Sequence, residues 1–143
     1  MGTEKIIPVV LDTNVIISAL LFGGTPGKLI HLRKTGTIQP FISKQMVDEL
    51  LKVLTYPKFA LNEAEIHYLL YAEILPYFEV IKMAAGPVII ESDPSDDIFL
   101  RCAVAASAAA LITGDKHLLT LKSFEHIPVL TPSQFLRKFQ LTA

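Results

Sequence analysis

Short apolar runs alternate with longer amphipathic segments along the whole chain. The runs that have the length of buried strands are 6–11, 38–42, 110–113 and 127–130. Helical patterns fill most of the sequence between them. Short strands that alternate with helices are typical of a parallel sheet covered on both faces. The pattern therefore predicts an α/β fold, a three-layer α/β/α sandwich with a central, mostly parallel sheet.

Capping and turn residues predict where the helices begin and end. Asp12 or Thr13 is placed to cap the first helix, and the glycine pair at 23–24 would end it. Thr25 followed by Pro26 has the form of an N-cap with proline at the first helical position, so we expect the second helix to start there. The predicted helices cover about residues 15–22, 26–35, 44–54, 63–75, 94–109, 116–121 and 132–139.

The composition fits one ordered domain over residues 1–143. Hydrophobic residues make up 51% of the chain and the mean hydropathy is +0.45, which is not the composition of a disordered protein. No apolar stretch reaches the roughly 18 residues of a membrane span, and the first residues lack the apolar core of a signal peptide. The single cysteine, Cys102, excludes an internal disulfide. We expect a cytoplasmic protein with no membrane partner.

The charge balance does not identify the ligand. The formal net charge is −1, whereas nucleic-acid-binding domains usually carry a basic surface. Either nucleic acid is not the ligand, or an acidic site offsets a basic rim elsewhere on the surface. The cations available for such a rim are Lys28, Arg33, Lys34, Lys44, Arg101, Lys116 and Lys122. A solvated surface position is the ordinary interpretation for any one of them.

Two acids follow apolar runs at the points where strands should end. Asp12 comes directly after the first run, and Asp115 comes after 110–113 with only Gly114 between. In open α/β sheets, ligands bind outside the carboxyl ends of the strands. Asn14 and Thr113 add polar atoms at the same two places. Each of the two acids is also a good helix N-cap, which is its ordinary explanation.

Two further acids belong to helices beside these strand ends. Glu49 lies on the flank of an apolar helix face, where a surface pair with Lys52 is the ordinary interpretation. Asp93 and Asp96 are well explained as residues that favour a helix start. Asp97 is less well explained, because the following helix is apolar almost all round and a buried acid is costly without a partner.

The acids taken together indicate a cation site. Clustered carboxylates raise one another's pKa unless a cation neutralises them. Oxygen ligands suit hard cations such as Mg²⁺ or Mn²⁺, and the four histidines show no zinc-type spacing. We therefore expect a metal-dependent enzyme.

The motifs resemble, in order and spacing, those of the PIN domain, a nuclease domain named for the PilT N-terminus. This domain forms the toxin half of many prokaryotic toxin–antitoxin pairs. The resemblance spans nearly the whole chain, and the ordered set is far more specific than its first motif alone. The matching residues are Val10-Leu11-Asp12-Thr13-Asn14-Val15, Ser43 with Asp48-Glu49-Leu50, Asp93-Pro94-Ser95-Asp96-Asp97, Thr113-Gly114-Asp115 with Leu118-Leu119, and Leu130-Thr131-Pro132 with Phe135-Leu136.

The resemblance implies divalent-metal-dependent cleavage of RNA phosphodiester bonds, with Mg²⁺ or Mn²⁺ as cofactor. Its supporting polar positions match Asn14 and Thr113, and Asp96 is a neighbour that would assist or replace Asp97. An RNA substrate, a homodimer and an antitoxin partner are implied as well. The candidate substrate contacts are Lys44, Arg101 and Lys116. The family's catalytic and metal-binding acids carry over to Asp12, Glu49, Asp97 and Asp115.

Two other functions compete with a ribonuclease toxin. A haloacid-dehalogenase-type phosphatase also ends its first strand in an aspartate, but it needs a second acid two residues later, where this chain has Asn14. The chain is also short for that fold. The non-enzymatic alternative is a catalytically silent module that binds RNA or a protein. The presence of all four family acids argues against such a loss of the site.

Overall fold

The computed structural model describes residues 6–82 and 97–141, and a single sheet forms its centre. The strands are β1 (Ile7–Leu11), β2 (Ile38–Ser43), β3 (Glu79–Ile81), β4 (Ala110–Ile112), β5 (Ser123–Phe124) and β6 (Ile127–Leu130). They are arranged in the order β3-β2-β1-β4-β6-β5. All neighbours are parallel except β5, which pairs antiparallel with β6. The predicted mostly parallel sheet is confirmed.

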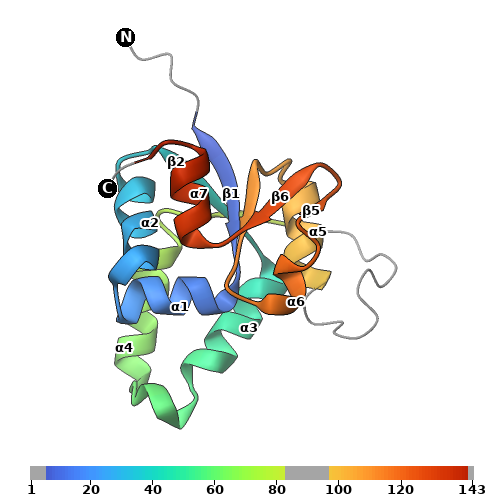
Figure 1. Ribbon diagram of the computed structural model, residues 1–143. Coiled ribbons are helices and arrows are strands. Elements are labelled where there is room, and N and C mark those ends of the chain that lie inside the picture. The colour runs from blue at the N-terminus through green and yellow to red at the C-terminus, as the bar shows by residue number, and fades with distance from the viewer. Residues whose placement is uncertain (1–5, 83–96, 142–143) are drawn as a thin grey trace.

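Helices cover the sheet in two layers (Figure 1). They are α1 (Thr13–Leu21), α2 (Gly24–Lys34), α3 (Lys44–Leu54), α4 (Glu63–Tyr68), α5 (Asp97–Ala105), α6 (Lys116–Leu119) and α7 (Pro132–Lys138), with a 3₁₀ turn η1 (Pro57–Phe59) and a π-helical segment η2 (Leu69–Ile74). Helices α2 and α7 contact each other and strands β2, β4 and β6. Helices α3 and α5 contact each other and strands β1, β2 and β4. The predicted α/β/α sandwich is therefore confirmed.

Strands β1 and β4 form the buried centre of the sheet. Residues 9–11 and 110–112 have almost no exposed surface, because helices lie on both faces of these strands. Such strands appear in sequence as unbroken apolar runs. The backbone N–H of Asp12 continues their pairing by donating to the carbonyl of Ile112 at 3.1 Å. The carboxyl ends of β1 and β4 therefore lie side by side.

The second helix begins earlier than the sequence predicts. Gly23 is its N-cap with φ +76°, and Gly24, with φ +64°, is its first residue, so Thr25 is not the cap. Glycine adopts such backbone angles without a Cβ clash, and the pair turns the chain by 89° between α1 and α2. By length and apolar composition, no single helix of the described residues could cross a membrane, and only the bent α1–α2 pair passes that test.

The helix expected from residue 94 to 109 is seen in part. Its first residues and the apolar run at 88–90 lie outside the described residues. The helix ends at Ala105 instead of Ala109, because Ser107 adopts φ +49° and Ala108 donates back to the carbonyl of Ala103 at 2.9 Å. A left-handed residue with this hydrogen bond is a common way to end a helix, and an alanine-rich sequence does not mark it.

A buried arginine joins α2 to the π-helical segment. Arg33, only 4% exposed, lies with Nη2 3.0 Å from Oε1 of Glu73 and also donates to the Glu73 carbonyl. Its guanidinium stacks 4.6 Å from the ring centroid of Tyr77. Lys34 also lies 3.4 Å from the Glu73 carboxylate. Arg33 therefore holds the fold, and both cations are paired with Glu73, so neither is a free cation of a basic rim.

Removing the Arg33 side chain should destabilise the protein far more than removing its neighbour. Arg33→Ala leaves the Glu73 carboxylate without its buried partner, which costs about 3 kcal/mol of unfolding free energy. Lys34→Ala, at a half-exposed position, should cost about 0.5 kcal/mol or less. Urea unfolding followed by circular dichroism measures both values. Equal losses in the two variants would contradict this account of Arg33.

Candidate active site

Asp12 is a buried acid whose two carboxylate oxygens are both hydrogen-bonded. It is 3% exposed and stands between the end of β1 and the start of α1. The backbone N–H of Val15 donates to Oδ1 at 2.8 Å, so Asp12 caps α1 as its sequence position suggests. The hydroxyl of Thr113 donates to Oδ2. The two donors fix the orientation of the carboxylate.

Thr113 links Asp12 to Asp115. Its side chain is fully buried just beyond the end of β4, and its backbone N–H donates to the Leu130 carbonyl at 2.8 Å. Its hydroxyl oxygen also accepts a hydrogen bond from the backbone N–H of Asp115 at 2.9 Å. The Asp115 carboxylate in turn caps α6 by accepting from the N–H of His117 at 2.7 Å. Asp115 thus has the predicted capping role and also lies beside Asp12.

Glu49 is brought to the same edge of the sheet by α3. This helix begins after Ser43 at the end of β2, and Ser43 caps it by accepting from the N–H of Met46 at 3.2 Å. The hydroxyl of Thr13 on α1 donates to Oε2 of Glu49 at 2.5 Å, across 36 residues of sequence. Among the ion pairs of the described residues there is none between Glu49 and Lys52. The surface pairing that seemed ordinary for Glu49 is therefore not what the structure shows.

The surroundings of Asp12 disfavour the charged form of its carboxyl group. Burial raises the pKa of its carboxyl above the ordinary value of 3.8, and the hydrogen bonds from Thr113 and Val15 lower it. The negative charges of Asp115 and Glu49 raise it further. Asp12, Glu49 and Asp115 are called the acidic site below. Its three members come from different elements and repel one another.

Asp97, the fourth predicted acid, begins α5. It is buried at the first position of α5, and its Oδ2 lies 3.8 Å from Nη2 of Arg101 one turn later. It is not among the charges that raise the pKa of Asp12. Asp96, the alternative to Asp97, lies outside the described residues. The role of Asp97 as a ligand stays a prediction.

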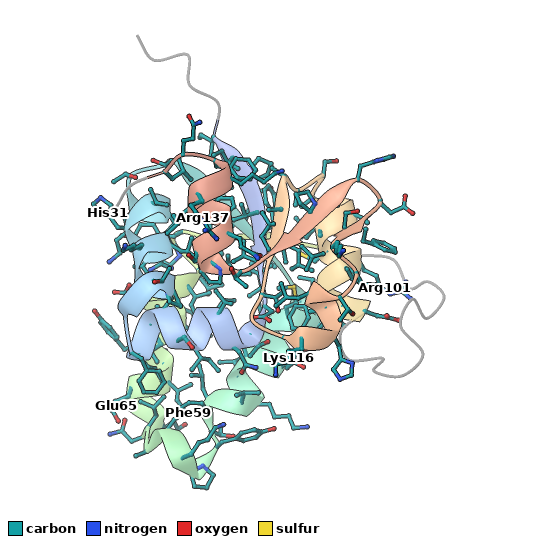
Figure 2. All side chains as sticks on the ribbon, in the orientation of Figure 1. His31, Phe59, Glu65, Arg101, Lys116 and Arg137 are labelled. Atoms are coloured by element: carbon teal, nitrogen blue, oxygen red, sulfur yellow. The ribbon has the colours of Figure 1, made fainter. Side chains whose placement is uncertain are left out.

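Three of the remaining predicted polar residues lie in the first turns of the helices that follow β1, β2 and β4. Asn14 is exposed on the first turn of α1. Lys44 and Lys116 are exposed at the first positions of α3 and α6. Figure 2 shows Lys116 at the start of α6, near the lower end of β1, and Arg101 on α5. Lys44 and Lys116 thus begin two of the helices that carry the acids.

The donor set fits a hard divalent cation in its chemistry. The acidic site offers carboxylate oxygens, with hydroxyl oxygens from two threonines beside them, and such oxygens are the ligands that Mg²⁺ and Mn²⁺ prefer. A bound cation would also offset the burial and the like charges that raise the pKa of Asp12. Within residues 6–82 and 97–141, no three acidic, histidine or cysteine side chains are close enough to form a ready metal-binding group.

The sequence did not reveal what Thr13 does. From sequence, Thr13 is only a polar residue at a strand end and a possible cap. In the structure it is buried and holds Glu49 through the hydrogen bond described above. A hydroxyl directly after the strand-end acid was the available signal, but its partner lies on another helix.

The raised pKa of Asp12 predicts a pH-dependent stability difference in the absence of metal. Below the ordinary pKa of 3.8, Asp12 is protonated in both the folded and the unfolded state, so it does not lower the free energy of unfolding. As the pH rises through the higher folded-state pKa, the folded protein loses stability. Asp12→Asn should therefore melt at a higher temperature than the parent at pH 7 in EDTA. The difference should shrink toward pH 4.

Asp48→Asn supplies the matched control. It removes the same charge from an exposed position on α3, next to Glu49. It should show no comparable trend when melting is followed by circular dichroism between pH 4 and pH 8. A parent more stable than Asp12→Asn at pH 7 would contradict the prediction.

Comparisons with known proteins identify the family. The family model for the PIN domain matches residues 8–117. An uncharacterized protein of Methanocaldococcus jannaschii is 33% identical over 153 aligned positions, which cover 96% of this chain and 95% of that protein. The matched range includes all four predicted acids.

Solved structures share the fold. VapBC2 from Rickettsia felis, bound to a DNA fragment from its promoter, superposes with a TM-score of 0.59 at 18% identity, covering 86% of this chain and 97% of that one. PAE2754 from Pyrobaculum aerophilum has a TM-score of 0.58 at 14% identity over 97% and 99% of the two chains. The PIN domain endonuclease Utp24 has a TM-score of 0.53 at 18% identity over 91% and 86%. With the match over residues 8–117, these findings show that the chain belongs to the PIN-domain family.

Proposed function

We propose that this chain is a divalent-metal-dependent ribonuclease. PIN domains are generally nucleases, and PIN nucleases typically use divalent metal ions. The observation that carries the proposal is the environment of the Asp12 carboxylate. Its carboxylate is buried at the end of the central strand, oriented by two donors and surrounded by like charge. Such a group is costly to keep unless a cation shares its site.

Each residue of the site has a role that follows from its contacts. Asp12 would be the central ligand, with Glu49 or Asp115 completing the set. Thr113 and the Val15 N–H keep the Asp12 oxygens in place, and Thr13 does the same for Glu49. A divalent cation held there would neutralise charge on the scissile phosphate and lower the pKa of a bound water.

The position of the basic side chains supports a phosphodiester substrate. Lys44 and Lys116 are exposed at helix starts beside the acidic site, where they would contact phosphate oxygens. Arg101 pairs with Asp97 and would orient that acid. RNA is proposed as the substrate on the strength of the family resemblance. A phosphatase of the haloacid-dehalogenase type is disfavoured because Asn14 occupies the place of its second acid.

We also propose that the ribonuclease is the toxin of a toxin–antitoxin pair, with an antitoxin protein as its partner. The support is the shared fold with VapBC2 from Rickettsia felis, whose structure includes a DNA fragment from its promoter. Free nuclease activity would be harmful to a cell, and an antitoxin would restrain it.

Cleavage should depend on both the metal and Asp12. The parent protein should cut labelled single-stranded RNA with Mg²⁺ or Mn²⁺ and not with EDTA. Asp12→Asn should lower the rate by about 100-fold or more, because even residues that only support metal ligands cost 10- to 100-fold when changed. Gel analysis of the fragments measures the rates.

Asp48→Asn is again the control and should keep nearly the parent rate, because Asp48 is exposed one residue before Glu49. Equal cleavage by the parent and by Asp12→Asn would sink the assignment. Release of phosphate from a small ester, without RNA fragments, would favour the phosphatase.

The toxin proposal predicts a growth phenotype. Induced expression of the parent chain in a bacterial host should stop growth, whereas Asp12→Asn at the same protein level should not, because the toxic effect requires catalysis. Growth curves with immunoblots for expression measure this. Normal growth at a high level of active parent protein would contradict the toxin role and leave the nuclease role standing.

A further inference from the structure

A second feature of the surface is a cationic groove. The groove has a volume of about 630 Å³ and is formed by α6, β6, α7 and the turn after α6. Its charged lining residues are Lys122, Arg137 and Lys138. Its apolar lining residues are Leu119, Val129 and Leu130. It is called the basic groove below.

The three cations of the basic groove are exposed and available to a ligand. None of them takes part in an ion pair within the described ranges 6–82 and 97–141, and no acidic side chain lines the groove. Arg33 and Lys34, by contrast, are engaged with Glu73. In a chain whose net charge is −1, three unpaired cations around one hollow form a local field that attracts anions.

The basic groove is joined to the acidic site through the backbone. The carbonyl of Leu130, which lines the groove, accepts the N–H of Thr113 at 2.8 Å. The N–H of Leu119, on the opposite wall, donates to the carbonyl of Asp115 at 2.9 Å. Figure 2 shows Arg137 on α7 and Lys116 at the start of α6. Leu130 and Leu119 therefore connect the walls of the groove to Thr113 and Asp115.

We propose that the basic groove binds the phosphate backbone of the RNA strand next to the bond that is cut; this rests on the proposed ribonuclease function. The acidic site repels a polyanion, so binding energy must come from elsewhere on the surface. Three cations would contact phosphates, and the apolar floor would lie against ribose and base faces. The groove is thus the basic surface that offsets the acids in a chain of nearly neutral net charge.

The test measures RNA binding separately from cleavage. All variants carry Asp12→Asn so that the RNA stays intact, and the affinity for a labelled single-stranded RNA is measured by fluorescence anisotropy across salt concentrations. Lys122→Gln, Arg137→Gln and Lys138→Gln together should weaken binding at least about tenfold at 0.1 M salt. The slope of log affinity against log salt should fall by about 2, because each phosphate contact contributes about 0.7.

A matched control removes three exposed lysines elsewhere. Lys52→Gln, Lys58→Gln and Lys82→Gln change the net charge equally, and all three side chains are exposed. This control should keep most of the affinity and nearly the full slope. If the triple groove variant does not fold, Arg137→Gln alone is measured instead. Its slope of log affinity against log salt should fall by about 0.7.

The outcomes separate the groove from the proposed function. Equal affinities for the groove and control variants would overturn the groove proposal, and metal-dependent cleavage by the parent would still support the ribonuclease. Absence of both cleavage and RNA binding in the parent would overturn both. Polyglutamate that competes as well as RNA at equal charge would overturn the RNA assignment and indicate an acidic protein partner.

Discussion

The structure depends on how a charged carboxylate is kept at the end of a buried strand. Asp12 has almost no exposed surface, and an unpaired charge there would cost several kcal/mol. One donor, the Val15 N–H, is supplied locally by the first turn of α1. The other, the Thr113 hydroxyl, comes from 101 residues away and is present only when β1 and β4 pair. The site therefore forms with the sheet and not before it.

Parallel pairing explains why the other acids gather at the same place. Neighbouring parallel strands end at one edge, so β2, β1 and β4 each deliver the start of a helix there. Asp12 and Asp115 cap two of these helices, and Glu49 lies on the third. The capping and the functional interpretations of an acid are thus compatible. Two of the acids stabilise helix starts. Burial raises the pKa of Asp12, and the charges of Asp115 and Glu49 raise it further, which favours a cation.

Sequence patterns predicted the parts of the structure that depend on local rules. The buried strands appear as continuous apolar runs, and the acids at strand ends appear as caps, so Asp12 and Asp115 could be identified together with their helices. The short edge strands β3 and β5 were not predicted, because two or three exposed or half-exposed residues leave no apolar pattern. The early start of α2 depended on glycine backbone angles that no composition rule specifies.

Contacts between distant segments could not be predicted, because the sequence does not show which side chains the fold brings together. The Thr13–Glu49 bond and the Arg33–Glu73 pair join residues more than 30 positions apart, and each side chain alone has an ordinary surface interpretation. The basic groove likewise combines α6, β6 and α7, and only Lys122 of its cations belonged to the predicted rim.

The central claim is that Asp12 binds a divalent metal ion. The most direct measurement is anomalous diffraction from crystals of the parent and of Asp12→Asn soaked in Mn²⁺. The account predicts a manganese peak within about 2.2 Å of an Asp12 oxygen, absent in the variant. A peak that avoids Asp12, or one that persists unchanged in Asp12→Asn, would contradict it.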